Sequence, residues 1–436
     1  MTAVQTSQLA LFGGTPVHDD KWPIWPQASA STLRMLHEAA TSGRWAVSGA
    51  FTGTPPFEQR FARAFADYHA VPYAVPTTNG SSALTIAMEA LGVGPGKEVI
   101  VPGLTWVACA SAAAGLGAVP VLVDVDPGTL SISADAAKAA ITDRTRAILV
   151  VHAYCSSADV DAFLRLSDST GIPIIEDCSQ AHGAEWNGRK VGTFGTIGVF
   201  SLQQTKVLTC GEGGMTITSS PELHDHLQQY RANGRRYTSD PPVVGQLDLE
   251  EVGAVEGHNY SMSEFHAAVG LSQLELLDQQ SDLRERNASL LSGLLAEIPG
   301  VSTLPAPGGL TKRTYYDYVI RLDPEVLGAF PIQSVVAALT AELNVFVETL
   351  DVPLNANPLY VPLKSPRLPR SEEARQLFRP SRFDLPEATA AYQSCVAFLH
   401  HALLGTADDV TAIAAAVGKV VVNIDQLRPS SPGAAS

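Results

Sequence analysis

The sequence predicts an α/β protein with a mostly parallel sheet in a large domain, followed by a smaller α+β domain. Between about residues 71 and 220, short apolar runs alternate with alanine-rich amphipathic stretches, a pattern typical of parallel sheets covered on both faces. Beyond residue 220, longer helical stretches accompany a few strand-like segments. We therefore expect an N-terminal segment (1–55), a large domain (56–270), a small C-terminal domain (271–426) and a disordered tail (427–436).

The expected elements follow the chain in order. After a proline-rich extended start, helices are predicted in STLRMLHEAATSGRW and PFEQRFARAFADYH, the second with aromatic residues at core spacing. A weak strand ends near Val75, and further strands are predicted at 98–101, 119–123, 147–151, 172–175 and 196–200. Helices are predicted at 81–91, 106–114, 158–169, 221–232 and 262–298. In the small domain we expect strands at 315–322 and 345–348, with helices at 332–343, 387–396 and 407–417.

The composition excludes several classes of protein. Hydrophobic residues make up 45% and charged residues 17%, the balance of an ordinary soluble enzyme. A net charge of −15 argues against non-specific binding to nucleic acid or to an anionic membrane. The five cysteines lack CxxC spacing, which favours reduced thiols over a zinc site or a disulfide framework. No signal peptide or membrane-spanning run is recognisable, so we expect a cytoplasmic protein.

Ligands of parallel sheets bind at the carboxyl ends of the strands, so polar residues after each apolar run are candidates. The weak strand is followed by TTNGSSAL, a glycine and hydroxyl cluster that opens a helix. The helix N-terminus, with hydroxyl donors from Ser81 and Ser82, could hold a phosphate, although simple N-capping is the alternative. The string GVGPGK at 92–97 is instead a turn, because Pro95 interrupts it and it leads into a strand.

Three further candidates follow other strands. Trp106 could cover a flat heterocycle, or it could be a core residue. Asp177 follows the apolar run at 172–175 by two residues, and a buried carboxylate there needs a partner such as a protonated ring nitrogen. The alternatives for Asp177 are a helix cap or a metal ligand, but no cluster with metal spacing surrounds it, so we expect no metal. Lys206, in FSLQQTKVLTCGEGG, suits a Schiff base, whereas most lysines are solvated surface charges.

Together these residues match the requirements of pyridoxal 5'-phosphate (PLP): a phosphate cradle, a ring cover, an acid for the ring nitrogen and a lysine. The motifs TTNGSSAL, EVIVPGLTWVA, IIEDCSQAHGA, FSLQQTKVLTCGEGG and HNYSMSEFHAA resemble those of the DegT/DnrJ/StrS family of PLP-dependent sugar aminotransferases. The resemblance runs from LALFGG near residue 9 to LLGTADDV near residue 410. It implies an aspartate-aminotransferase-like fold (fold type I) and ping-pong amino transfer.

The resemblance also implies roles for individual residues. Lys206 would form the Schiff base and act as the proton-transferring base, and Asp177 would bind the pyridine nitrogen. Trp106 would stack on the ring, and Gln180 would lie near its phenolic oxygen. The phosphate would be held by Gly80, Ser81 and Ser201, and by Asn259 of the neighbouring subunit in a homodimer. Family members that act as dehydratases carry histidine in place of the lysine, so the intact Lys206 favours amino transfer.

Several segments resemble the cyclitol branch of the family, which aminates scyllo-inosose or 2-deoxy-scyllo-inosose with glutamine in aminoglycoside antibiotic pathways. They are LALFGG, PGLTWVACASA, FSLQQTK and FLHHALLG. The resemblance makes His400, His401 and Tyr316 candidates for substrate contacts. In HAYCSSAD, Cys155 stands where relatives commonly have glycine, so the loop around it departs from the family pattern.

Three alternatives remain open at this point. A nucleotide-linked keto-deoxysugar aminotransferase would need an extended cationic groove, whereas a neutral cyclitol needs a compact polar pocket. A synthase that aromatises an aminocyclohexenone would use the same lysine as a dehydration base. A PLP-binding regulator without turnover is the third alternative, although the sequence contains no helix-turn-helix or basic arm.

Overall fold

A computed structural model describes residues 8–366 and 371–427. Its central sheet has seven strands in the order β1-β9-β8-β5-β4-β2-β3. They are β1 (Tyr73–Thr77), β2 (Glu98–Pro102), β3 (Val119–Val123), β4 (Thr145–Val151), β5 (Ile174–Asp177), β8 (Ile197–Ser201) and β9 (Gly214–Thr218). Only β9 is antiparallel to its neighbours, β8 and β1, so the other strands end at the same edge. The predicted mostly parallel sheet is confirmed.

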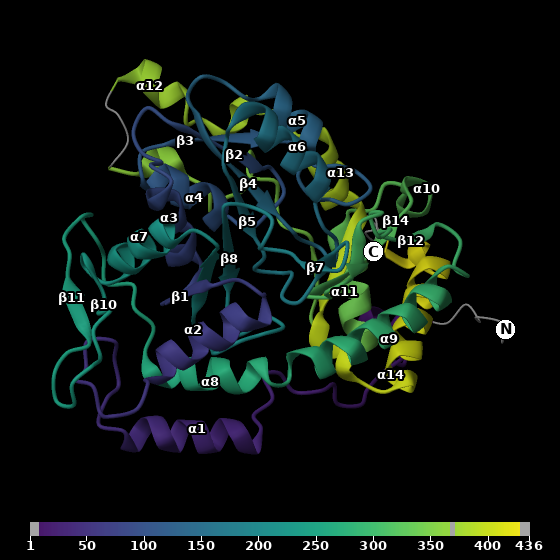
Figure 1. Cartoon of the computed structure of the whole chain (residues 1–436). Coiled ribbons are helices and arrows are strands. Elements are labelled where there is room, and N and C mark those ends of the chain that lie inside the picture. The colour runs from purple at the N-terminus through teal and green to yellow at the C-terminus, as the bar shows by residue number, and fades with distance from the viewer. Residues whose placement is uncertain (1–7, 367–370, 428–436) are drawn as a thin grey trace.

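Helices cover both faces of this sheet (Figure 1). One face packs against α3 (Gly80–Ala90), α4 (Ala108–Gly115) and α7 (Pro221–Arg231), and the other against α2 (Phe57–Tyr68), α5 (Ala134–Ala139), α6 (Val160–Thr170) and α8 (Glu264–Leu274). Successive side chains of β2 point to opposite faces of the sheet. Val99 packs in the same cluster as Leu84 of α3, whereas Ile100 packs with Phe163 of α6. Burial on both faces explains why the strands are largely apolar.

A second, antiparallel sheet has the order β12-β14-β16-β15 and lies with its helices on the right of Figure 1. Its strands are β12 (Val301–Thr303), β14 (Asp317–Leu322), β16 (Cys395–Leu399) and β15 (Val347–Thr349). The main helices beside it are α9 (Leu277–Leu295), α11 (Ile332–Leu343) and α14 (Ala407–Val422). Shorter helices are α10 (Pro324–Leu327), α12 (Glu372–Gln376), α13 (Pro386–Ser394), η2 (Pro362–Lys364), η3 (Pro380–Arg382), η4 (His400–Leu404) and η5 (Ile424–Leu427). This sheet agrees with the predicted α+β character of the C-terminal part.

The N-terminal segment and two small ribbons complete the fold. After η1 (Ala10–Phe12), an extended stretch leads to α1 (Ala30–Thr41), which begins with a capping box between Ser29 and Thr32 and lies along α8 (Figure 1). One ribbon contains β6 (Glu185–Trp186), β7 (Arg189–Lys190) and β13 (Leu310–Lys312), and the other contains β10 (Arg235–Tyr237) and β11 (Leu249–Glu251). Because β13 pairs with β6, the chain beyond α9 is hydrogen-bonded to the large unit.

One predicted element is wrong, another ends two residues early, and two central strands were not predicted. The single helix expected at 262–298 is two helices, α8 and α9, separated by Glu275 and Leu276. The helix expected at 387–396 ends at Ser394, and the chain continues directly into β16. Neither β9 nor β16 was expected as a strand. Both are central strands of their sheets and pair with a strand on each side. This pairing stabilises the extended conformation even where the local spacing of apolar residues resembles a helix or a turn.

The expected domain boundaries remain a proposal. The boundary between residues 270 and 271 falls within α8, and we propose that the two units divide in the short link between α8 and α9. Of the predicted tail at 427–436, residues 428–436 lie outside the described residues. Among the described residues, no helix combines the length and the apolar character that crossing a bilayer requires.

Candidate active site

A cavity of about 600 Å³ lies where the carboxyl ends of the large sheet meet the small sheet. One side of it is built from segments that follow β1, β2, β4, β5 and β8, and the other from β14, β15 and the loop after β15. The predicted site residues that line it are Gly80, Ser81, Trp106, Asp177, Gln180, Ser201, Lys206 and Tyr316. In the described part of the chain, Asn259, His400 and His401 are not among its lining residues.

The N-terminus of α3 opens into this cavity. Asn79 caps the helix, because its Oδ1 accepts the Ser82 backbone N–H at 2.7 Å. The amides of Gly80 and Ser81 precede the first intrahelical hydrogen bond and have no acceptor within the helix. A Cβ on Gly80 would lie 2.7 Å from the Cβ of Ser201, so the close approach of these two segments requires glycine. The free amides and the helix dipole form a cradle suited to a phosphate.

Asp177 is the last residue of β5 and is only 3% exposed. Its Oδ1 accepts the Ser179 backbone N–H at 2.9 Å, and its Oδ2 accepts the Cys109 thiol at 3.4 Å. Burial and the charge of Asp177 raise the pKa of Cys109 well above its ordinary value, so the thiol keeps its proton. The carboxylate is thus held by two donors, neither of which carries a charge.

Lys206 lies in the turn after β8, across the cavity from the small sheet. Its Nζ lies 3.8 Å from the centroid of the Tyr316 ring. Burial lowers the pKa of the Lys206 amine, and the nearby carboxylates, led by Asp317 and followed by Asp177, offset only part of this effect. A lowered pKa leaves more of the amine neutral, the form that can attack a carbonyl carbon.

His400 is fully buried behind Lys206 instead of facing the cavity. Arg284 Nε donates to His400 Nδ1 at 3.1 Å, so the ring proton lies on Nε2, which donates to the Thr205 carbonyl at 2.9 Å. Burial, reinforced by Arg284, lowers the pKa of His400 well below its ordinary value and keeps the ring neutral. These contacts make His400 a positioning residue for the segment that carries Lys206.

The remaining two predicted residues also lie outside the cavity. His401 is half-buried, with its ring nearly perpendicular to that of His400. Asn259 is exposed and forms an isolated β-bridge with Ala232. A side chain that is exposed and outside its own cavity remains available for contact with another subunit.

The loop after β4 accounts for the unusual Cys155. Tyr154 and Cys155 both have positive φ angles, of 56° and 52°, a conformation that glycine adopts most readily. The Tyr154 backbone N–H donates to Gln180 Oε1 at 3.1 Å, and Arg313 Nε donates to the Cys155 carbonyl oxygen. Cys155 therefore has the positive-φ backbone conformation that glycine favours, and these two hydrogen bonds stabilise the loop in that conformation.

Among the cavity residues that sequence reasoning missed are Tyr154, Asp317, Glu348 and Asp351. Asp317 is 5% exposed and begins the largely apolar strand β14, and Glu348 is the middle residue of β15. A carboxylate next to or within a short strand of the small domain is the signal that could have found both. The Tyr154 hydroxyl donates to Asp351 Oδ2 at 2.8 Å across the two sheets, a contact that no local pattern reveals.

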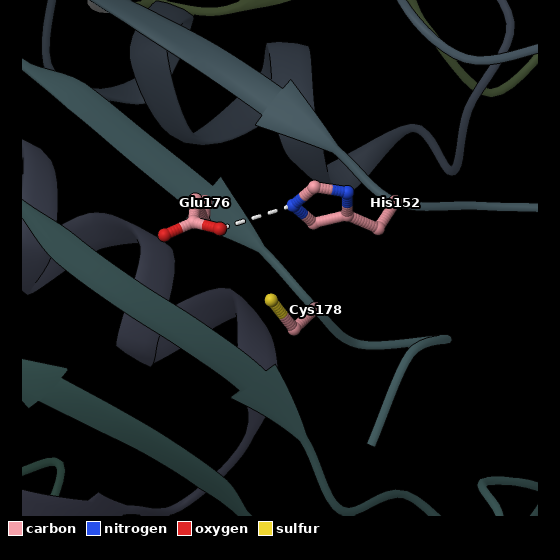
Figure 2. Close-up of side chains that lie close together, drawn as sticks. All are labelled: His152, Glu176 and Cys178. Atoms are coloured by element: carbon pink, nitrogen blue, oxygen red, sulfur yellow. Dashed lines mark hydrogen bonds and ion pairs between the residues drawn. The ribbon is translucent and has the colours of Figure 1, made fainter. Parts of the chain in front are cut away.

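Beneath the cavity, His152, Glu176 and Cys178 lie close together, with their ligand atoms within 4.8 Å of one another (Figure 2). His152 Nε2 lies 3.2 Å from Glu176 Oε2, and the same carboxylate accepts the backbone N–H groups of Gly192, Phe194 and Gly195. Burial raises the pKa of Cys178 well above its ordinary value, so this thiol is a poor metal ligand. The hydrogen bonds indicate that Glu176 anchors the loop between β7 and β8.

The strand ends of the parallel sheet bring a lysine, a buried carboxylate and a helix N-terminus to one cavity. This arrangement defines an α/β enzyme of the aminotransferase fold. The chain belongs to the DegT/DnrJ/EryC1/StrS aminotransferase family, whose model matches residues 30–418.

Two relatives are similar over nearly their whole length. The L-glutamine:scyllo-inosose aminotransferase of Streptomyces griseus is 48% identical over 97% of this chain and 99% of its own. The L-glutamine:2-deoxy-scyllo-inosose aminotransferase of Streptoalloteichus tenebrarius is 47% identical over 96% and 99%. Among solved structures, 3-amino-5-hydroxybenzoic acid synthase has a TM-score of 0.78 at 29% identity and covers 93% of this chain and 99% of its own.

Proposed function

We propose that the protein is a PLP-dependent aminotransferase that moves the amino group of L-glutamine to a keto-cyclitol, scyllo-inosose or 2-deoxy-scyllo-inosose. Its pathway would be the biosynthesis of an aminoglycoside antibiotic. The similarity to the two inosose aminotransferases supports this choice of donor and acceptor. The five cysteines are buried and free, which suits a reducing cytoplasm.

The observation that carries the proposal is the charge of the cavity. Among its described lining residues, Lys206 is the single Lys or Arg, whereas the acidic ones are Asp177, Glu212, Asp317, Glu348 and Asp351. A nucleotide diphosphate would bring two negative charges into this acidic environment and would find no cationic groove. An uncharged polyhydroxylated ring avoids this repulsion. The charge therefore favours a keto-cyclitol over a nucleotide-linked keto-sugar.

The residues present fit PLP. The amides of Gly80 and Ser81, with the side chain of Ser201, would hold its phosphate at the N-terminus of α3. Trp106 is 56% exposed at the cavity wall, where its indole could cover the ring. Asp177, whose described donors are both neutral, would pair with the protonated ring nitrogen.

When bound, PLP supplies an electron sink that makes the Cα–H bond of the amino donor acidic. Lys206 would hold the cofactor covalently and, once released from it, would carry the proton from Cα of the donor. Its lowered pKa suits this role, because the amine is neutral when it accepts the proton and can return it afterwards. Asp177 would keep the ring nitrogen protonated throughout, since its negative charge favours the cationic form of its partner.

We further propose a homodimer with shared active sites. Asn259 is exposed and outside its own cavity, consistent with a contact to the phosphate of a second copy. Val243, Val244 and Leu247 are exposed in the loop between β10 and β11, which projects at the left of Figure 1. Exposed apolar side chains grouped in this way are typical of a surface that another subunit covers.

A substrate panel tests the proposed function. The enzyme with PLP and L-glutamine is offered scyllo-inosose, 2-deoxy-scyllo-inosose, a nucleotide-linked keto-deoxysugar and an aminocyclohexenone, and the products are identified by mass spectrometry. We expect an aminocyclitol from one or both inososes. Turnover of the nucleotide-linked sugar alone, or formation of an aromatic product alone, would show that the proposed acceptor is wrong.

A further inference from the structure

The small sheet contributes three carboxylates to the cavity, here called the acidic wall: Asp317, Glu348 and Asp351. Asp317 begins β14, Glu348 lies in β15, and Asp351 lies in the loop that follows β15. The cofactor functions discussed above are all assigned to residues outside this wall. The acidic wall therefore faces the part of the cavity that is left for the substrate.

The wall is electrostatically unfavourable in the protein alone. Burial raises the pKa of Asp317 well above its ordinary value, and Glu348 and Asp351 raise it further, while Lys206 lowers it. Burial also raises the pKa values of Glu348 and Asp351. Like charges gathered in a buried site cost stability, so their presence requires a compensating partner.

The hydrogen bonds of the wall are incomplete. Asp317 Oδ1 is buried and has no hydrogen-bond partner among the described residues. Asp351 Oδ2 accepts the Tyr154 hydroxyl at 2.8 Å, which orients this carboxyl group. Oδ1 of Asp317 is enclosed by protein, so the groups of the wall that a ligand can reach most readily are the half-buried carboxyl groups of Glu348 and Asp351, both of which line the cavity. Buried polar groups are normally paired, so such a wall suits a ligand that brings hydrogen-bonding groups.

A metal ion does not account for these oxygens. In the described part of the chain, the group of metal-ligating side chains that converges on one point is His152, Glu176 and Cys178, not the acidic wall. Hydroxyl groups are donors that suit such a wall, because each can donate to a carboxylate and can also accept from a carboxyl group that keeps its proton. A cyclitol presents a hydroxyl at nearly every ring carbon.

We propose that Asp317, Glu348 and Asp351 select the acceptor, by forming hydrogen bonds with its ring hydroxyls and by excluding acceptors that carry phosphate groups. This inference rests on the proposed function and adds the residues that recognise the acceptor. Ring hydroxyls can pair with these carboxyl groups whether or not the carboxyl groups keep their protons. A phosphate group would find Lys206 as the single Lys or Arg among the described lining residues, beside carboxyl groups that repel it whenever they are ionised.

The test compares a neutral and an anionic cyclitol in the PLP-loaded enzyme. myo-Inositol and myo-inositol 1-phosphate are measured as competitive inhibitors against scyllo-inosose, in the wild type and in Glu348→Gln. Glu348 is half-buried, so this change is milder than one at Asp317. We expect kcat/KM for scyllo-inosose to fall by about tenfold, because the amide replaces a hydrogen bond to a charged group by a weaker, neutral one. The preference for myo-inositol over its phosphate should fall by a similar factor.

The matched control is Glu325→Gln, which removes the same charge from an exposed position on α10. It should leave both the turnover and the inhibitor preference at wild-type values. The rate of the half-reaction with glutamine can be measured without acceptor from the change in cofactor absorbance. Glu348→Gln should lower this rate less than it lowers the turnover of the acceptor. An unchanged inhibitor preference in Glu348→Gln overturns the role of the wall while leaving the proposed function intact. A wild-type enzyme that does not aminate scyllo-inosose or 2-deoxy-scyllo-inosose overturns the proposed function itself.

Discussion

Replacing His400 by phenylalanine should destabilise the protein by about 2 to 6 kcal/mol. Phenylalanine retains a ring of similar shape but removes both ring nitrogens. The Arg284 Nε–H and the Thr205 carbonyl would each lose the partner that His400 provides, at 3.1 and 2.9 Å. A buried polar group left without its partner costs about 1 to 3 kcal/mol, and two such groups give the stated range. Arg284 has little capacity to compensate, because its Nη1 and Nη2 are already buried without partners among the described residues.

The assay is urea unfolding of the PLP-loaded enzyme, followed by circular dichroism at matched protein and cofactor concentrations. His401→Phe is the control, because it makes the same chemical change one residue away at a half-buried ring. It should cost about 1 kcal/mol or less. Because Thr205 precedes Lys206, His400→Phe should also release cofactor faster than the control does. Equal unfolding midpoints for the two variants would refute the positioning role of His400.

The remaining predictions concern the cavity itself. Lys206→Ala should abolish transamination and change the visible absorbance of bound PLP, because no other lining residue in the described part of the chain offers an amine; retained turnover with glutamine and an inosose would rule out the assigned role. Tyr154→Phe should move the acidic limb of kcat/KM for the acceptor to higher pH. The Tyr154 hydroxyl lowers the pKa of Asp351, so without it the carboxylate form appears only at higher pH; an unmoved limb would contradict the coupling. Tyr392→Phe, a hydroxyl loss on α13 away from the cavity, is its control.

The part of the site that could be predicted from sequence lies next to strand ends. Asp177, Ser81 and Lys206 each follow an apolar run within a few residues, so the topology of a parallel sheet was enough to bring them together. The resemblance to a known family then assigned a role to each. The same reasoning recovered the parallel sheet, since its strands are buried on both faces and are therefore largely apolar.

The rest of the site depends on contacts between distant segments. His400 was expected in contact with substrate, but its ring nitrogens are occupied by Arg284 and Thr205, residues more than a hundred positions away. The acidic wall was missed for a similar reason, because Asp317 and Asp351 face Lys206 only after the small sheet has packed against the large one. Short sequence patterns carry no information about such pairings.

The cavity joins two stretches of chain that mutation can alter separately. Within one subunit, the residues proposed to hold the cofactor occur between Gly80 and Lys206, whereas the acidic wall occurs between Asp317 and Asp351. Recombination or mutation in the second stretch could therefore change which ketone the enzyme accepts without altering the residues that carry out amino transfer. A chimaera that exchanges 317–359 between relatives would carry the whole acidic wall and is expected to transfer acceptor preference, and the hydrogen bond from Tyr154 is the contact such a graft must preserve.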